Sequence, residues 1–320
     1  MNEAVFRRRI ELTIGPLPEN VLASNSDGNA IKIVSDGTQN TLRTRFTVFK
    51  QYGATPMPSQ IVVSNLGPDL REAIQKTPNV RVVLKVGWDN TELMELLIGS
   101  VVSVISKRNG ADIETTIYVY AGFKSISEAT CQLSFTSGVA VKDIVYGIAL
   151  NFQNENPNLK ISKDKIQITS ATIGSGGYSD TAPASVSLNR LARIYGFSWG
   201  IEKDQFWAVS DGNAINSQIT IGTSNGFLIR ADPMVITAPG QLAEGKTNPA
   251  FYIGMTILSI LHPLIEAAGL VYLDSAINPK LNDPKGFIVN FVTHTGDSHG
   301  EEWYSEIQSY NYGNLASGNF

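Results

Sequence analysis

The stretch Leu96–Tyr120 reads LLIGSVVSVISKRNGADIETTIYVY and carries the clearest fold signal in the chain. Two apolar, β-branched runs flank Asn109-Gly110, and Asn-Gly between such runs is a strong signal for a tight hairpin turn. Gly99 lies inside the first run, where a glycine often marks a bulge or a bend in a strand. We therefore expect a long hairpin with strands over Leu96–Ser106 and Glu114–Tyr120.

The residues before this hairpin show the same period-two alternation. Apolar and polar residues alternate along three segments, and a short helix with a proline in its first turn is expected at Gly67–Lys76. The three expected strands are Ile31–Val34, Thr41–Lys50 and Arg81–Gly87. Several strands, hairpin turns and one small helix favour a closed or split barrel over residues 1–124.

Residues 125–212 have a different pattern. Val139–Leu150 and Ser187–Tyr195 carry apolar residues at helical spacing, and Gly196 is well placed to end the second helix. A hairpin follows around Glu202-Lys203-Asp204, between Phe197–Ile201 and Gln205–Val209. This order of helices and short strands predicts a small α/β domain.

From residue 213 to residue 310 the chain is β again, and residues 311–320 form a Gly, Asn and Ser-rich tail that we expect to be mobile. The fold class predicted from the whole chain is mainly β with an α+β insertion. The expected strands of the last β region are Gln218–Ile221, Met255–Leu261, Leu270–Leu273, Phe287–His294 and Glu302–Tyr310.

Composition excludes several classes of protein. Of the 320 residues, 42% are hydrophobic and 17% charged, which is a globular balance, and the net charge of −4 argues against a protein that wraps nucleic acid. Cys131 is the one cysteine, so no intrachain disulfide forms, and its alternating surroundings favour a buried thiol. We expect no secretory signal at Phe6–Glu11, and no membrane span at Gly254–Leu273, where Pro263 and Glu266 interrupt the apolar run.

Three motifs suggest chemistry, and each has a simpler structural explanation. Gly222-Thr223-Ser224-Asn225-Gly226 matches the nucleophile elbow of hydrolases, but an extended segment follows where the elbow needs a helix, so a turn is expected. His294, Asp297 and His299 offer two imidazoles and a carboxylate, but their spacing is not an established metal-ligand pattern and the flanking glycines favour a hairpin loop. His262 precedes Pro263 in an apolar run and is expected to be a packed residue.

Carboxylate pairs complete the list of candidates. Glu301-Glu302 and Glu92/Glu95 are more simply explained as solvated faces or loop ends than as a catalytic pair. We therefore expect no catalytic, cofactor or metal site, and no enzyme activity.

Two segments resemble the baseplate hub proteins of contractile-tailed phages and pyocin-like particles, a family that includes the late control protein D-like proteins. The first is Phe46–Gly122, with a strand ending in the Gly-aromatic step Gly87-Trp88. The second is Asn225–Tyr304, and it ends in the most specific part of the resemblance, a motif of five residues. These are His294, Gly296, Asp297, Gly300 and Trp303.

The resemblance implies a homotrimer in which each chain contributes two tube-like β-barrel domains, at residues 1–124 and 213–310, on either side of the small α/β domain. Three chains then form a pseudo-six-fold ring that joins a hexameric tail tube to a trimeric spike and lets DNA pass. The implied partners are a tube protein or tube initiator, the central spike, and a baseplate wedge or tape measure protein, without sequence-specific binding of nucleic acid. The implied location is the virion tail baseplate, after assembly in the host cytoplasm.

The motif also carries structural expectations. We expect the loop from His294 to Trp303 to close the second barrel, with Trp303 packed and Asp297 accepting backbone hydrogen bonds across a tight turn. Two alternatives stay open. One is a cell-wall hydrolase of the tail, and the other is a carbohydrate-binding tail protein that uses Trp199 and Trp207 as an aromatic platform, although both tryptophans look like hairpin core.

Overall fold

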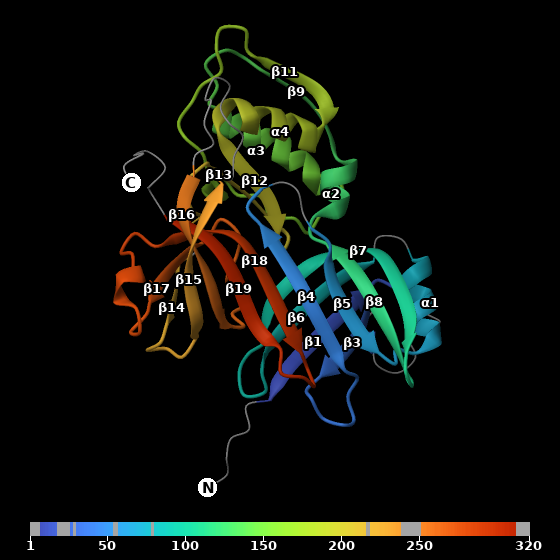
Figure 1. The fold of residues 1–320 in the computed structure, drawn as a ribbon. Helices are drawn as coiled ribbons and strands as arrows, with labels where there is room; N and C mark the ends of the chain where they lie inside the picture. Colours follow the sequence, from blue (N-terminus) through green and yellow to red (C-terminus); the bar gives the residue numbers. More distant parts are fainter. Residues whose placement is uncertain are drawn as a thin grey trace.

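A computed structural model describes residues 7–17, 26–27, 30–53, 57–77, 80–215, 218–237 and 251–311. The fold is mainly β with small α insertions, as the sequence predicts. Two groups of strands lie side by side, and the helical part of the chain sits at one end of both (Figure 1). Residues 312–320 of the expected mobile tail lie outside the described residues.

The first strand group precedes the helical part. Its strands follow the order β4-β5-β8-β7-β6-β1-β3 in the sheet, and α1 connects β5 to β6. The Asn109-Gly110 turn is present, and β7 extends three residues beyond the predicted Ser106. The bounds are β1 Arg8–Gly15, β2 Ser26–Asp27, β3 Ala30–Ser35, β4 Thr44–Gln51, β5 Ser59–Ser64, α1 Pro68–Lys76, β6 Arg81–Trp88, β7 Met94–Asn109 and β8 Asp112–Tyr120.

The second strand group follows the helical part. Its order is β15-β16-β19-β18-β17-β14, which repeats the order β4-β5-β8-β7-β6-β1 of the first group strand for strand. One direction differs, because β1 pairs antiparallel with β6 whereas β14 pairs parallel with β17. The bounds are β14 Gln218–Gly222, β15 Leu228–Thr237, β16 Phe251–Ile260, β17 Leu270–Asp274, η4 Pro279–Leu281, β18 Phe287–Asp297 and β19 Trp303–Asn311.

The two groups are parts of one sheet. β18 of the second group pairs with β4 of the first, so that β15 to β3 form a continuous path of hydrogen-bonded strands. The described residues contain no backbone pairing between β3 and β4, or between β14 and β15, that would close either group on itself.

The helical part contains both predicted helices and the predicted hairpin. Gly196 ends α4 with φ +65°, the left-handed conformation that favours glycine, and Lys203 and Asp204 form the tight hairpin turn at positive φ. α2 and the pairing of β9 with β11 were not predicted from the sequence. The bounds are α2 Phe123–Glu128, β9 Thr130–Phe135, α3 Val141–Leu150, η2 Asn151–Asn154, η3 Lys163–Lys165, β10 Ile166–Gln167, β11 Tyr178–Pro183, α4 Ala184–Tyr195, β12 Phe197–Glu202 and β13 Gln205–Ser210.

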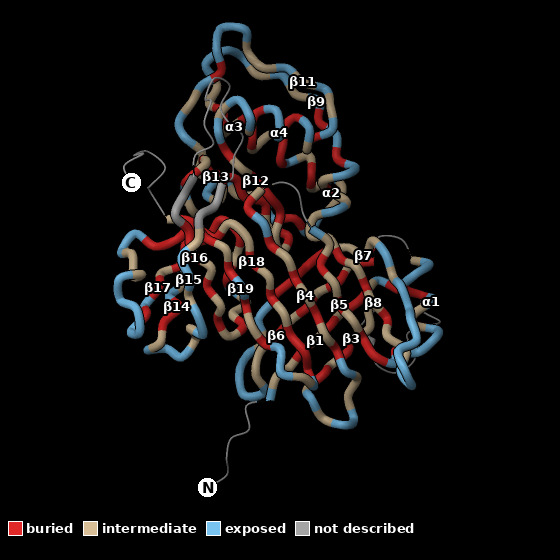
Figure 2. The backbone as a smooth tube through the Cα atoms, viewed as in Figure 1, coloured by how far each residue is buried: buried red, intermediate tan, exposed pale blue. Residues whose placement is uncertain are grey.

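Separate hydrophobic cores lie inside the two strand groups and the helical part, and buried residues recur along the strands of both groups (Figure 2). Trp199 and Trp207 are only 1% and 3% exposed, and Trp199 stacks on Phe152 at a ring distance of 5.7 Å. These two tryptophans therefore do not form the exposed platform that the carbohydrate-binding alternative requires. Cys131 is buried, as expected, with its Sγ 3.3 Å from Ser187 Oγ.

Candidate functional site: the seam between β4 and β18

The seam is the antiparallel pairing of β4 with β18, where the two strand groups meet. Its register runs from Phe291 opposite Gln51 to Asp297 opposite Arg45. Alternation places Phe46, Val48 and Lys50 on the buried face of β4. The five motif residues, His294, Gly296, Asp297, Gly300 and Trp303, all lie on β18, on β19 or on the loop between them.

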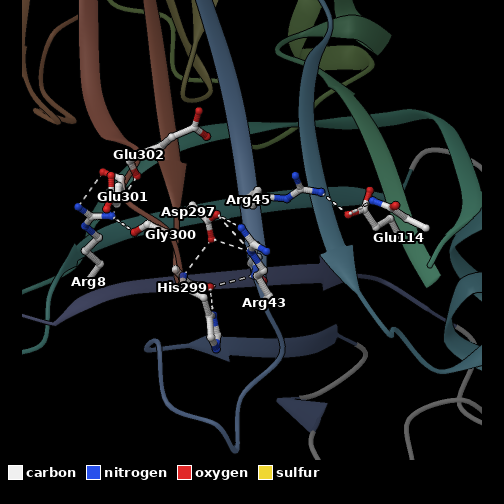
Figure 3. Close-up of polar contacts among 12 residues, drawn as sticks. Arg8, Arg43, Arg45, Glu114, Asp297, His299, Gly300, Glu301 and Glu302 are labelled. Carbon is white, nitrogen blue, oxygen red and sulfur yellow. Dashed lines mark hydrogen bonds and ion pairs between the residues drawn. The ribbon is translucent and has the colours of Figure 1, made fainter. Parts of the chain in front are cut away.

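Asp297 ends β18 and binds across the seam (Figure 3). Its Oδ1 accepts a hydrogen bond from Arg43 Nε at 3.1 Å and one from the backbone N–H of His299 at 2.9 Å. Burial by itself raises the pKa of this carboxyl group, but the hydrogen bonds from Arg43 and from the backbone outweigh it, so the pKa of Asp297 lies below its ordinary value. Asp297 is therefore a buried, ionised anchor, and it accepts the backbone bond that the sequence predicts.

The residues after Asp297 extend this contact. The backbone N–H of Ser298 donates to the carbonyl of Thr44 at 3.0 Å, and the N–H of Thr44 donates to Ser298 Oγ at the same distance. His299 Nδ1 lies 2.8 Å from Ser298 Oγ, and its Nε2 lies 3.1 Å from the carbonyl oxygen of Thr38. The loop is thus bound both to the segment that connects β3 to β4 and to the first residue of β4.

Trp303 packs into the core of the first strand group, not into that of the second. The ring is 5% exposed, meets Phe46 edge-on at 6.0 Å and lies 5.8 Å from the ring of Trp88. Arg8 covers it from outside, with its guanidinium 5.7 Å from the ring centroid and hydrogen bonds to the carbonyls of Gly300 and Glu301. The prediction that Trp303 is packed is confirmed, and the prediction that the loop closes the second barrel is wrong. The loop joins the second group to the first, because the matching apolar surface belongs to β4 and β6.

The two glycines of the motif are required by close packing. A Cβ on Gly296 would lie 2.3 Å from the ring of Phe46, and one on Gly300 would lie 2.3 Å from Asp297 Oδ2. Side chains at these positions would displace the ring of Phe46 or the Asp297 carboxylate. Close packing therefore requires glycine at Gly296 and Gly300, and this requirement cannot be read from the sequence alone.

His294 lies deeper in the seam and is fully buried. Its Nδ1 is 2.8 Å from Ser305 Oγ, and its Nε2 is 3.3 Å from the carbonyl oxygen of Ile265. Burial and the nearby Lys50 charge hold its pKa well below the ordinary value, so the ring is neutral. His294 sits in β18 rather than in the loop, and it binds neighbours different from those of His299.

Beside His294, charged residues from all three parts of the molecule converge. Lys50 of β4 donates to the carbonyl of Ile265 at 3.3 Å, and Lys203 of the β12–β13 turn lies 2.9 Å from Glu266. Burial, followed by repulsion from Lys203, lowers the pKa of Lys50 to about 8, and burial raises the pKa of Glu202 to about 7. We call Lys50, Glu202, Lys203, Glu266 and His294 the junction cluster.

The other sequence candidates have structural roles. Ser224 lies in a turn between β14 and β15 and donates to Asp274 Oδ2 at 2.6 Å, so the elbow motif is a turn, as expected. His262 is half-buried and meets Phe227 edge-on at 5.0 Å. Within the described residues, no group of three or more His, Cys, Asp and Glu side chains is placed to hold a metal ion, and no helix there is long and apolar enough to cross a membrane.

Sequence reasoning missed Arg8, Arg43 and Lys50. For Lys50 a signal existed, because the alternation that buries Phe46 and Val48 also places position 50 on the buried face. A charged residue at such a position must find polar partners. For Arg8 and Arg43 no local signal existed, since their partners lie more than 250 residues away in the chain.

The sequence matches no protein-family model and no curated protein. Solved structures are similar over nearly the whole chain. One is the tail protein from Neisseria meningitidis MC58, with a TM-score of 0.55, 10% identity, and coverage of 95% of this chain and 97% of that one. Another is the 43 kDa tail protein of prophage MuSo2 from Shewanella oneidensis, with a TM-score of 0.56, 8% identity, and coverage of 94% and 96%.

A third similar structure is an Escherichia coli component of the type VI secretion system, described as structurally similar to the T4 phage tail proteins gp27 and gp5. Its TM-score is 0.54, its identity 10%, and the match covers 87% of this chain and 76% of that one. The three matches agree on the fold at identities too low to carry residue roles. The chain therefore has the fold of these phage tail and type VI secretion proteins, with β4 and β18 joined at its centre.

Proposed function

We propose that this chain is a structural hub of a phage tail baseplate, and that three copies form a ring between a six-fold tail tube and a three-fold spike. The observation that carries the proposal is the repeated strand order, β4-β5-β8-β7-β6-β1 and β15-β16-β19-β18-β17-β14, within one chain. A ring of three chains needs two equivalent elements per chain to present six similar faces to a tube. The likeness to tail proteins over the whole chain supports the same role.

In this proposal residues 1–124 and 213–310 act as the two tube-like barrel domains, and residues 125–212 act as the small α/β domain between them. The seam fixes the angle between the two barrel domains, since Trp303 and Asp297 bind the second strand group to the first. The partners are further copies of the chain, the tube protein or tube initiator, the central spike, and wedge or tape measure proteins. The ring lets DNA pass without binding a specific sequence, and the role includes no catalytic step.

The direct test is the mass of the purified chain by light scattering, alone and mixed with the tube and spike proteins of the same particle. We expect a species of three times 34.7 kDa. Electron microscopy of the assembly should show the two strand groups related by about 60°, as six similar elements around one axis require. A chain that stays monomeric with both neighbours present would contradict the proposal.

A further inference from the structure

The two strand groups match not only in strand order but also in register. In the β7–β8 hairpin one residue, Val102, bulges between Val101 and Ser103, and in the β18–β19 hairpin Asn290 bulges in the same way. Directly before each bulge, a backbone N–H donates to a carbonyl oxygen. Val101 donates to Val80, the residue before β6, at 2.8 Å, and Val289 donates to Gly269, the residue before β17, at 2.9 Å. Val102 and Asn290 are therefore equivalent positions.

Beyond the bulge, the two hairpins differ in what lies on their outer edge. Residues Phe291–Asp297 of β18 pair with β4, and this pairing is the seam. The equivalent residues of β7, Ser103–Asn109, pair with β8 on one side and with no described strand on the other. Unpaired strand edges of this length are open to pairing with another chain.

The free edge of β7 also exposes apolar surface. Ile105 is 42% exposed, while its neighbour Val104 packs against the first core from the opposite face. Lys107 follows on the face of Ile105 and is exposed as well. The edge thus presents an apolar residue and a cation at fixed spacing.

The strand equivalent to β4 in the second group is β15, and it too has a free edge. β15 pairs with β16 and with no other described strand. Equivalent residues can be followed from strand to strand through the pairings. Phe46 is equivalent to Ala231, because the β5 residue opposite Phe46 is equivalent to the β16 residue opposite Ala231. On the same count, Thr47 is equivalent to Asp232 and Phe49 to Met234.

We propose that the free edge of β7 pairs antiparallel with the free edge of β15 in a second copy of this chain, in the register of the seam. The seam places Thr293 opposite Phe49 and Thr295 opposite Thr47. The equivalent register places Ile105 opposite Met234 and Lys107 opposite Asp232 of the second copy. The inference rests on the proposed ring-forming role and names the surface that performs it.

The side chains at these positions are complementary. Ile105 and Met234 bring two apolar side chains together, and Lys107 meets a carboxylate that is 55% exposed and bound only by the exposed Arg230 among the described ion pairs. Pro233 faces the same edge and supplies no N–H, so the ladder lacks one hydrogen bond but keeps the proline carbonyl as an acceptor. A free edge that carries a proline is also a poor partner for an unrelated strand.

Repetition of this contact closes a ring. Each chain has one internal seam, β18 with β4, and offers two free edges, that of β15 at the end of the sheet and that of residues Ser103–Asn109 of β7. Head-to-tail contacts of this kind generate a closed ring when the rotation between units closes. Internal seams and contacts between copies then alternate around the ring.

Paired cysteines test the register. Ile105 and Met234 form a non-hydrogen-bonded pair in the proposed ladder, where Cα atoms lie about 4.5 Å apart, a separation that a disulfide spans. The full-length double variant I105C/M234C should form disulfide-linked dimers and trimers under mild oxidation. The matched control S106C/M234C is one residue out of register, with its side chains on opposite faces, and should form at least tenfold less.

Charge reversal gives a second measurement. K107E should weaken self-association about fivefold per contact, the effect of losing one cross-strand ion pair and adding a repulsion, and K107E/D232K should restore it. K285E, an exposed change in a loop away from both edges, should leave the association unchanged.

The outcomes separate this inference from the proposed function. Trimers that form normally but do not cross-link through I105C/M234C, or that cross-link equally through the control, overturn the strand pairing and leave the hub role in place. A chain that is monomeric with tube and spike proteins present, and that forms no cross-links, overturns both.

Discussion

The two strand groups share one strand order, yet one hairpin is bound along its outer edge and the other is not. On β18 this edge is filled by β4, and Trp303 and Asp297 at the hairpin tip are buried against the first group. On β7 the same edge is free, and the tip at Lys107–Gly110 is exposed. The motif residues therefore serve the contact between the two strand groups and are not needed for the hairpin fold, because the β7–β8 hairpin forms without them.

The largest expected effect on stability is at Trp303. Its equivalent in the first group is Ile113, because the two residues lie opposite equivalent residues of the β18–β19 and β7–β8 hairpins. Trp303→Ala should lower the free energy of unfolding by about 3–5 kcal/mol, since it removes a buried ring from the seam. Ile113→Ala, where the side chain is only half-buried, should cost less than about 1 kcal/mol. Urea unfolding measures both, and equal losses would show that the two hairpin tips are energetically alike.

The buried Lys50 should make the stability of the seam depend on pH. Its pKa is about 8 in the folded chain against 10.5 as the ordinary value, so between these pH values the unfolded chain binds more protons. Lys50 should therefore contribute a rise of about 3 kcal/mol to the free energy of unfolding from pH 8 to pH 10.5, at 1.36 kcal/mol for each pKa unit. Lys50→Met should abolish the rise, whereas the exposed control Lys285→Met should keep it. A rise that persists in Lys50→Met would show that the Lys50 ammonium group is not its origin.

The smallest effect concerns Asp297. Its folded pKa lies below the unfolded value of 3.8, so its contribution is fully present above that pH and is lost as the pH falls through the folded pKa. Asp297→Asn should lower the free energy of unfolding by about 1 kcal/mol at pH 7, a value that allows for the half-exposed Arg43. The difference from wild type should vanish on acidification.

The matched control for Asp297 is Asp143, which pairs with Lys163 on the surface. Asp143→Asn should cause no measurable change at either pH, because both partners are solvated. A pH-independent loss in Asp297→Asn would mean that its carboxylate acts by shape and not by charge.

The local elements and the fold class follow from short-range signals in the sequence. Asn109-Gly110 specifies its turn, Gly196 ends its helix, and the alternation along β4 and β6 assigns their buried faces, because each of these signals acts within a few residues. The five motif residues were singled out by the resemblance alone, whereas the chemistry of a Gly-flanked aspartate correctly predicted the backbone hydrogen bond that Asp297 accepts.

The surface that this motif binds is set by long-range packing. Asp297 and Arg43 are 254 residues apart, and Arg8 lies 293 residues from Glu301, so no local pattern couples them. Gly296 reads as a loop residue until the ring of Phe46 is seen beside it. Whether a strand edge is paired or free depends on which distant strand reaches it, and period-two alternation fixes the faces of a strand while leaving its edges undetermined.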